Sequence, residues 1–271
     1  MVQTKTNNLH RRLIFIFLSV TLIVTSATAL YRLYQQRQNR AAYENAQSLF
    51  YEHHSLTHAA IHGIPSEFTL DDPSPKIINP AIEALQEINS DVIAWIQIAE
   101  TQIDYPVVQG VDNRKYLDHN WQNEKNRAGS IFMDYRNDPH KLNEPGRHTI
   151  LYGHHMRDGS MFQPLTNYLR EDFFENHSII TLQGMYEIYV FEIFSVYVTD
   201  TDFYYIETIF ENPSDFEFFL EQITDKSIYD TEQRLTRQDH LLTLSTCTYE
   251  YDDARLVVHA RLIDTSKEEG S

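Results

Sequence analysis

The chain has 271 residues, of which 42% are apolar and 13% aromatic, enough to form a substantial hydrophobic core. Its single cysteine excludes an internal disulfide framework and a metal site built from several cysteines. The formal net charge is −17, but residues 1–40 hold six of the 22 basic side chains and no acidic one, which leaves 16 basic against 39 acidic residues from position 41 onward. So acidic a body repels polyanions, and nucleic-acid binding is not expected.

An uncharged apolar run near the N-terminus predicts a membrane anchor. Residues 13–30 read LIFIFLSVTLIVTSATAL, with arginines on both sides. As a helix this run would span about 27 Å, close to the roughly 30 Å hydrocarbon core of a bilayer. We expect an anchor over residues 13–31 after a short tail of residues 1–12. A cleavable signal peptide is the alternative, since Ala27-Thr28-Ala29 resembles a cleavage site, but the apolar run is long for such a signal.

Residues 32–80 are predicted to form a helical stalk and a linker. The first part is rich in Gln, Arg, Ala, Glu and Leu and contains no proline or glycine before Gly63. The second part, Pro65 to Pro80, includes Asp-Asp-Pro-Ser-Pro, a composition typical of a loop. Basic residues do not decide which side of the membrane the following domain occupies, because each flank of the apolar run carries three of them.

From residue 81 the pattern becomes rich in β-strands. A short amphipathic helix is expected over residues 81–89. Strands are expected at 92–98, 105–109, around 131 and 150, and at 185–198, where MYEIYVFEIFSVYV is dense in β-branched and aromatic residues. A helix is expected over 212–226, since Asn212 suits the N-cap and Pro213 the first turn. Its stripe of Phe216, Phe219, Leu220 and Ile223 is interpreted as core.

The only cysteine ends a strand-like run, Leu241–Cys247, and Arg255 opens the next one. Alternation places Ser245 and Cys247 on one face of the first strand. A seven-residue connection allows the two strands to pair antiparallel, which would set Cys247 beside Arg255. A lone cysteine is commonly a small buried apolar residue, so this placement alone does not make it a nucleophile.

A nucleophilic thiol needs a base or a cationic neighbour, because a free cysteine is mostly protonated at neutral pH. Among the 13 histidines, His154 and His155 are the best placed. They follow a strand-like run that ends at Gly153, which frees the backbone to turn, so one of them would be presented at a strand end. Either side chain fits the role at this point.

At these residues the sequence resembles the sortases, membrane-anchored cysteine transpeptidases of Gram-positive bacteria. Thr243-Leu-Ser-Thr-Cys247 followed by Arg255 is similar to their TLxTC…R signature, and Tyr152-Gly-His154-His-Met to their histidine segment. Two further segments resemble class B sortases in particular: Gly129-Ser-Ile-Phe-Met-Asp-Tyr-Arg-Asn137 and Tyr105-Pro-Val-Val-Gln-Gly-Val-Asp-Asn113. The similarity covers roughly residues 40–264.

The resemblance implies a mainly β fold: an eight-stranded sortase-type β-barrel with an N-terminal helical extension and an inserted helix before the cysteine strand. The barrel would occupy residues 81–264, and residues 265–271 would form a disordered tail. By motif, Cys247 would be the nucleophile, His154 the acid and base, and Arg255 the group that holds substrate or stabilises the oxyanion. Candidates for the substrate-binding groove are Asn113, Leu117 and Ser245.

The implied reaction is cleavage of an Asn-Pro-x-Thr-x sorting signal after Thr, followed by transfer of the protein to an amine of lipid II or peptidoglycan. No cofactor and no metal is required. The chain would cross the cell membrane once, with its N-terminus inside and its catalytic domain outside. Alternatives are a sortase that polymerises pilins, a papain-like cysteine peptidase, and a catalytically dead surface adhesin or scaffold.

Overall fold

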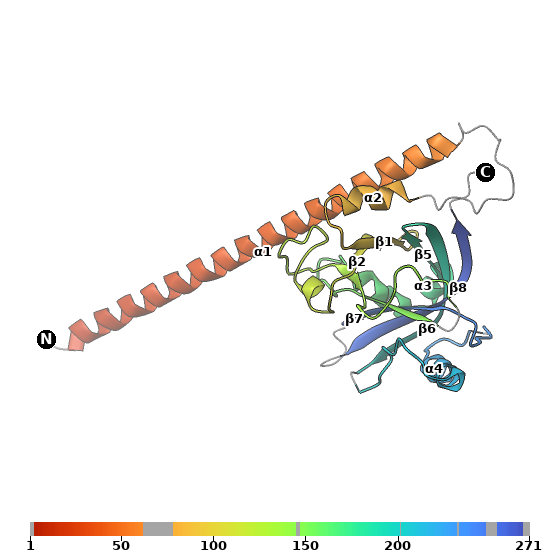
Figure 1. Ribbon diagram of the computed structural model, residues 1–271. Helices are drawn as coiled ribbons and strands as arrows, with labels where there is room; N and C mark the ends of the chain where they lie inside the picture. The colour runs from red at the N-terminus through yellow and green to blue at the C-terminus, as the bar shows by residue number, and fades with distance from the viewer. Residues whose placement is uncertain are drawn as a thin grey trace. The chain divides into compact units, whose positions relative to one another are not determined.

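The computed structural model describes residues 3–61, 78–144, 147–200, 202–231, 233–247 and 254–267 (Figure 1). The side chains of residues 3–11, 55–61, 247, 266 and 267 lie outside the described part. The chain divides into two units, residues 1–41 and residues 42–271.

The first unit lies within the long helix α1, Gln3–Ile61. Its apolar side chains are exposed, for example Phe17 at 71% and Leu22 at 67% of their surface. The helix contains an 18-residue window with a mean hydropathy of 2.4, so it is long and apolar enough to cross a membrane. The predicted anchor lies on this helix.

The second unit begins with the last part of α1, which packs on the core. Ala46 and Phe50 are fully buried, and the Phe50 ring stacks on Trp95 with the ring centroids 4.2 Å apart. The next helix, α2, runs over Pro80–Gln86 and is capped by Asn79, whose Oδ1 accepts from the amides of Ala81 and Ile82. It is three residues shorter at its C-terminal end than the helix predicted from the sequence.

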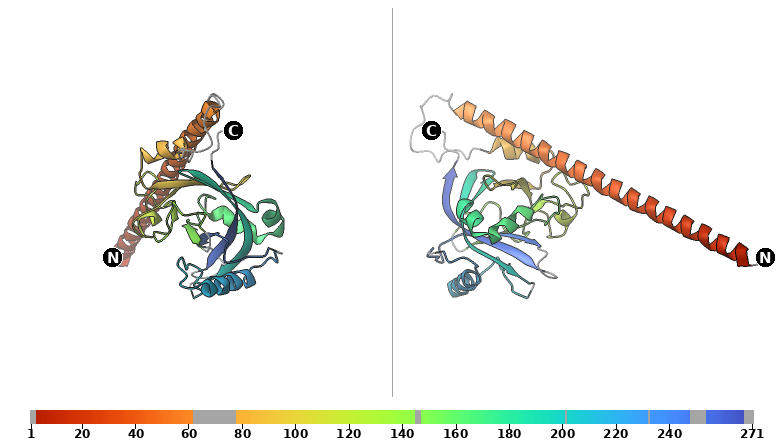
Figure 2. Two further views of the ribbon diagram at one scale, coloured as in Figure 1. Left: turned by 45° about the vertical axis from the view of Figure 1, so that its right-hand side comes forward. Right: turned by 180° about the vertical axis from the view of Figure 1, so that it is seen from behind.

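Eight strands of the described chain form a closed barrel in the order β1-β2-β3-β4-β7-β8-β6-β5 (Figures 1 and 2). Their bounds are β1 Val92–Gln97, β2 Asp104–Val108, β3 Ile131–Met133, β4 His148–Tyr152, β5 Ile179–Gly184, β6 Glu187–Thr199, β7 Leu241–Cys247 and β8 Arg255–Lys267. The pairs β2–β3 and β4–β7 are parallel, and the remaining pairs are antiparallel. Closure leaves no open sheet edge.

Two strand details differ from the expectations. The sequence did not single out β5, which pairs antiparallel with both β1 and β6. Strand β8 extends to Lys267, three residues past the predicted end of the barrel at residue 264. The reason for the second difference is the length of β6, whose first residue, Glu187, pairs with Lys267.

Short helices fill the connections, and one longer helix covers the outside of the barrel. The short ones are η1 Lys115–Leu117, η2 Gln163–Leu169 and α3 Glu171–Asn176. The longer one is α4, Pro213–Asp225, and its stripe of Phe216, Phe219, Leu220 and Ile223 is buried, as expected of a core. These side chains form a second apolar cluster with residues of β6, β7 and β8, separate from the main cluster.

The strands β7 and β8 send alternate side chains to these two clusters. Leu242 and Leu244 of β7, with Val258 of β8, belong to the main cluster. Leu241 of β7 and Val257 of β8 belong to the cluster under α4. The two faces of this strand pair are therefore both buried over most of their length, which fixes the register of the strand that carries Cys247.

Candidate active site

The parallel pairing of β4 with β7 determines which residues lie opposite each other near the strand ends where the predicted catalytic residues are found. Each residue of β4 pairs with the residue of β7 that lies 93 positions later, ending with Tyr152 opposite Ser245. The amide of Gly153 continues the contact by donating to the Ser245 carbonyl at 3.2 Å. At the same offset His154 falls level with Cys247, whereas His155 falls one residue beyond it.

The antiparallel pairing of β7 with β8 places Cys247 directly opposite Arg255. The predicted neighbourhood of these two strand ends is therefore present in the backbone. The Arg255 side chain is half-buried, and its Nη1 donates to the Ala254 carbonyl at 3.1 Å. The side chain of Cys247 and residues 248–253 lie outside the described part of the chain.

The ring of His154 has a defined orientation. Its Nε2 lies 2.7 Å from the backbone carbonyl oxygen of Leu117, the last residue of η1. A carbonyl only accepts, so Nε2 carries the hydrogen and the neutral ring keeps its free lone pair on Nδ1. The Leu117 side chain itself is 44% exposed.

Gly129 allows this close approach. It has a φ of +60°, and a Cβ built on it would lie 2.5 Å from the Tyr116 carbonyl oxygen and 3.1 Å from Cδ2 of His154. The hydroxyl of Tyr43, on α1, donates to the Gly129 carbonyl at 2.9 Å. The part of α1 that belongs to the barrel unit therefore helps to hold the loop on which His154 rests.

The other two predicted groove residues are engaged within the chain. The Asn113 amide donates to Asp134 Oδ2 at 2.9 Å and accepts from the Tyr135 amide at 3.0 Å. The Ser245 hydroxyl is 2.8 Å from the hydroxyl of Tyr205, and both residues are buried. Tyr205 belongs to the connection between β6 and α4, and sequence reasoning did not identify it.

Behind these residues, a chain of hydrogen bonds crosses four strands. The Nδ1 of His148 contacts the Glu207 carbonyl, which only accepts, so its Nε2 receives the hydroxyl hydrogen of Thr243. Thr243 Oγ1 in turn accepts from Nδ1 of His259 at 2.6 Å, and Nε2 of His259 accepts from the Tyr197 hydroxyl at 2.7 Å. The chain links β6, β8, β7 and β4, and so aligns the strands that carry the candidate residues.

Three buried histidines of the barrel, His148, His240 and His259, are neutral at physiological pH. Burial lowers the pKa of His148 to about 4, and burial likewise lowers the pKa of His240 to about 4. Burial and the neighbouring His148 hold the pKa of His259 well below its usual value. These three residues serve as fixed hydrogen-bonding groups of the fold, not as titrating groups at neutral pH.

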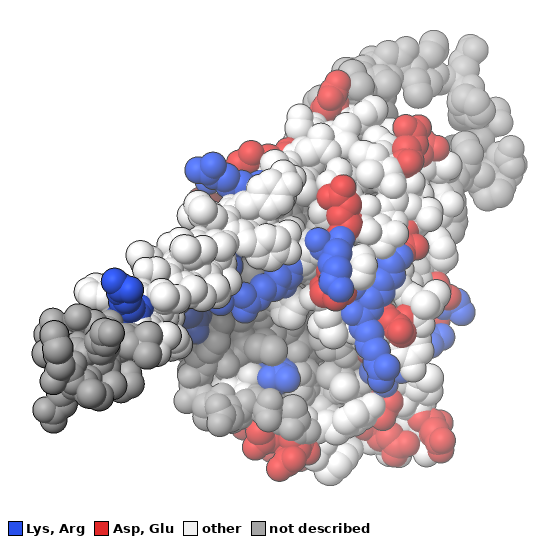
Figure 3. Space-filling view, turned by 90° about the vertical axis from the view of Figure 1, so that its left-hand side faces the viewer, with Lys and Arg blue, Asp and Glu red and all other residues white. Residues whose placement is uncertain are grey.

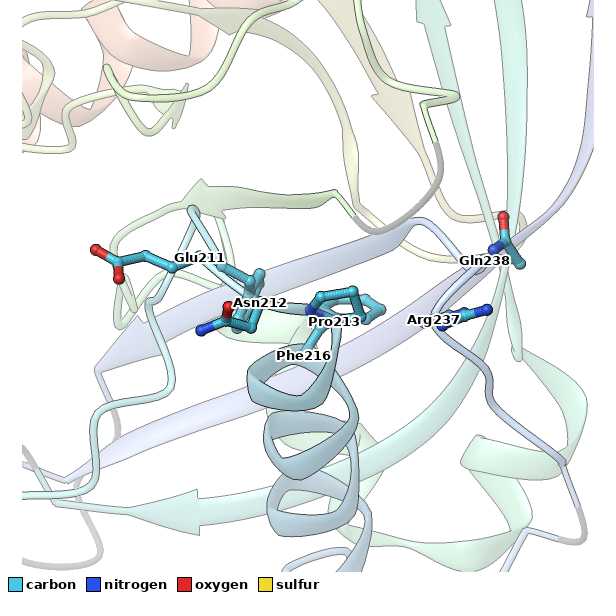
Figure 4. Close-up of a pocket in the computed structure, with 7 residues that line it drawn as sticks. Glu211, Asn212, Pro213, Phe216, Arg237 and Gln238 are labelled. Atoms are coloured by element: carbon cyan, nitrogen blue, oxygen red, sulfur yellow. The ribbon is translucent and has the colours of Figure 1, made fainter.

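A hollow at the start of α4 contains none of the predicted site residues. Figure 4 shows its lining, which consists of Phe210, Glu211, Asn212, Pro213, Phe216, Arg237 and Gln238. Within the described residues, no group of three or more His, Cys, Asp or Glu side chains is arranged to hold a metal ion. On the face seen in Figure 3, basic and acidic side chains are intermixed, although the formal net charge is −17.

Comparison with known proteins places this barrel in a family. Residues 96–263 match the model of the sortase domain. The chain is 44% identical to sortase B of Listeria monocytogenes over 188 residues, which cover 69% of this chain and 75% of the relative. It is 36% identical to sortase B of Staphylococcus aureus over 253 residues, which cover 93% and 96%.

A solved structure agrees with these sequence matches. The Staphylococcus aureus sortase B–substrate complex superposes with a TM-score of 0.72 at 36% identity, covering 87% of this chain and 99% of that one. The chain belongs to the sortase family, a family of transpeptidases. The expected eight-stranded sortase barrel and the resemblance to class B sortases are thereby confirmed.

Proposed function

We propose that this chain is a membrane-anchored cysteine transpeptidase that cleaves an Asn-Pro-x-Thr-x sorting signal after Thr and transfers the protein to an amine of a cell-wall precursor. The observation that carries the proposal is the strand register at one end of β4, β7 and β8. It places Arg255 opposite Cys247, and the β4–β7 offset carried two residues past the Tyr152–Ser245 pair would set His154 level with Cys247. This register supports a site in which a thiol, an imidazole and a guanidinium act together in acyl transfer through a thioester.

In the first half-reaction, the proton of the Cys247 thiol passes to His154, and the resulting thiolate attacks the carbonyl carbon of the signal's Thr. The tetrahedral intermediate collapses to a thioacyl-enzyme as the carbon–nitrogen bond breaks, and His154 gives a proton to the leaving amine. In the second half-reaction, His154 takes a proton from the incoming amine, which attacks the thioester and releases the thiolate. The same nitrogen thus acts first as acid and then as base.

The contact to Leu117 supports Nδ1 as that nitrogen. Because Nε2 donates to the Leu117 carbonyl, the proton that moves during the reaction enters and leaves at Nδ1. The carbonyl also stabilises the imidazolium, since it remains an acceptor when the ring is doubly protonated. Leu117 therefore has a backbone role here, in addition to the groove position proposed for its exposed side chain.

Arg255 is proposed to stabilise the oxyanion or to hold the peptide. Its guanidinium provides several fixed donors, and charge-assisted hydrogen bonds are stronger than neutral ones. The positive charge also favours the thiolate form of a cysteine on the adjacent strand. Its position opposite Cys247 supports both roles.

The peptide groove is proposed to run along the β7 end, past Asn113, Leu117 and Ser245. Leu117 offers an exposed apolar side chain, while Ser245 acts through its bond to Tyr205. Asn113 is tied to Asp134, so its part is to shape the wall of the groove. The solved Staphylococcus aureus sortase B–substrate complex supports substrate binding by this kind of barrel.

The proposed arrangement in the cell follows the domain boundaries predicted from the sequence. Residues 13–31 would anchor the chain, 32–80 would form the stalk and linker, and 81–264 the catalytic barrel outside the membrane, with the N-terminus inside. The apolar exposed face of α1 supports the anchor. The proposed partners are surface proteins that bear a C-terminal sorting signal, and lipid II or peptidoglycan, whose amine accepts the transferred protein.

The test is a transfer assay with the full-length chain in detergent micelles. A library of Asn-Pro-x-Thr-x peptides would be offered together with several amines, and the products read by mass spectrometry. We expect cleavage after Thr and an adduct of the amine with the Thr carboxyl group. Hydrolysis without an adduct for any amine would favour a cysteine peptidase, and a preference for a lysine side chain of a pilin would favour pilus assembly.

A further inference from the structure

The segment Gly129–Asn137, singled out above by its resemblance alone, contains a buried carboxylate with an unusual number of donors. The Asp134 side chain is 0% exposed. Its Oδ1 accepts from the backbone amide and from Nε of Arg136, at 3.0 and 2.9 Å. Its Oδ2 accepts from Arg136 Nη2 at 2.8 Å, and from Asn113 Nδ2 and the Tyr152 hydroxyl, each at 2.9 Å.

These donors come from segments that lie next to the candidate site. Tyr152 ends β4, two residues before His154. Asn113 precedes Leu117, whose carbonyl holds the His154 ring, by four residues. A displacement of Asp134 would therefore move both the end of β4 and the loop of Asn113, the two segments that flank His154.

Arg136 carries the same network across to a third segment. While Nε and Nη2 form a two-pronged contact with the Asp134 carboxylate, Nη2 also donates to the Ile206 carbonyl at 2.8 Å. Its Nη1 donates to the Tyr204 hydroxyl at 3.2 Å. Tyr205, between these two residues, bonds to Ser245 on the cysteine strand.

The opposite charges of Asp134 and Arg136 stabilise this hydrogen-bond network. Burial alone would raise the pKa of Asp134, but the hydrogen bonds from Arg136, Asn113 and Tyr152 outweigh burial and lower it. Asp134 is therefore ionised at neutral pH, and the guanidinium neutralises it. A planar guanidinium can satisfy both carboxylate oxygens and a carbonyl at once, which an ammonium cannot.

We propose that the Asp134–Arg136 pair is a positioning unit, which holds the loop of Asn113, the end of β4 and residues 204–206 as one wall of the peptide groove. The inference rests on the proposed function, because it assigns the pair to binding of the sorting-signal peptide. The pair acts through the residues it holds and takes no part in bond making. Its loss should therefore weaken peptide binding while leaving the thiol chemistry intact.

The kinetic test compares Arg136→Lys and Asp134→Asn with the wild type, all full-length and in detergent. Iodoacetamide titration of the single cysteine gives the concentration of reactive enzyme for normalisation. We expect KM for the Asn-Pro-x-Thr-x peptide to rise about tenfold in Arg136→Lys, as for the loss of one charge-assisted hydrogen bond. The pH profile of alkylation should stay unchanged. Arg147→Lys, which alters an exposed arginine paired with Glu144, is the matched control and should leave KM unchanged.

A second measurement does not depend on activity. Hydrogen exchange, read by mass spectrometry, should rise at residues 203–210 in Arg136→Lys but not in Arg147→Lys. Unchanged KM and unchanged exchange in Arg136→Lys would overturn the proposal, even if Asp134→Asn does not fold. If the wild type cleaves no peptide of this type, the proposed function fails, whereas increased exchange in the same samples would still establish that the pair holds this segment.

Discussion

Nε2 of His154 and the backbone carbonyl of Leu117 lie 2.7 Å apart, so the ring of the predicted base is oriented by a main-chain group and not by a carboxylate. A neutral acceptor orients the ring without adding a negative charge beside it. The contact leaves Nδ1 as the nitrogen that can reach a substrate.

The first prediction concerns the choice between the two adjacent histidines. His154→Ala should abolish cleavage of an Asn-Pro-x-Thr-x peptide, because the offset of the β4–β7 pairing would set His154 level with Cys247. His155→Ala should retain most of the activity, since His155 lies one position beyond that level. A fluorogenic peptide assay decides between them. Loss in His155→Ala together with retention in His154→Ala would transfer the role to His155.

The second prediction concerns the nucleophile and its cationic neighbour. Cys247→Ala should remove all cleavage, and full activity in that variant would contradict a cysteine enzyme. Arg255→Lys should lower kcat about 100-fold, as for the loss of one oxyanion donor, because an ammonium cannot reproduce the planar fork. Arg261→Lys, on the same strand and paired with Glu192, is the control. Near-normal turnover in Arg255→Lys would exclude a geometric role.

The third prediction concerns Gly129. Its φ of +60° and the 2.5 Å approach of an added Cβ to the Tyr116 carbonyl oxygen predict that Gly129→Ala destabilises the fold by about 2 kcal/mol or more. The loop would shift, and with it the Leu117 carbonyl, so peptide cleavage should fall as well. Gly110→Ala is the control, because its nearest atom would be 3.2 Å away. Equal unfolding free energies in the two variants would contradict this account.

The fourth prediction concerns the bond between Ser245 and Tyr205. Ser245→Ala and Tyr205→Phe each remove one of the two hydroxyls, and each should lower the free energy of unfolding by about 1 kcal/mol. Because the two groups are partners, the double variant should cost less than the sum of the two single ones. Chemical denaturation of the four proteins measures the coupling. Strict additivity would mean that the two hydroxyls do not stabilise each other.

The fifth prediction concerns pH. The pKa of His148 and that of His240 are each about 4 in the fold, below the usual 6.5, so the unfolded chain binds these protons first as the pH falls. Stability should therefore be full above about pH 6.5 and decline towards pH 4, by roughly 3 kcal/mol for each histidine. Denaturation of His148→Gln should show a smaller decline. His140→Gln, at an exposed histidine, is the control, and an equal decline in both variants would refute the assignment.

The sequence predicted best what depends on neighbours along the chain. The alternation in Leu241–Cys247 and the short connection to Arg255 were enough to place these two residues side by side, because a hairpin's register follows from its turn. The stripe of α4 was readable for the same reason, since it repeats with the helical period. Strand β5 was missed because its run, Ile-Ile-Thr-Leu-Gln-Gly, is less dense in β-branched and aromatic residues than the run at 185–198 that follows it.

Contacts between distant segments left no such pattern. The parallel pairing of β4 with β7, which brings His154 level with Cys247, has no turn that would reveal it, and only the family resemblance pointed to that pair. The bond from His154 to Leu117 and the bond from Tyr205 to Ser245 join residues 37 and 40 positions apart. Asp134 lies in a segment that was noticed, but a burial that depends on Arg136 and Tyr152 cannot be read from spacing.

The parallel pairing of β4 with β7 also bears on when the enzyme becomes reactive as it folds. Hairpins such as β7–β8 can form early, since little chain entropy is lost in closing a short connection. Joining β4 to β7 must close 93 residues, and contacts of such separation form late. A partly folded chain in which β4 has not yet joined β7 therefore keeps the segment of His154 apart from the strand that ends at Cys247.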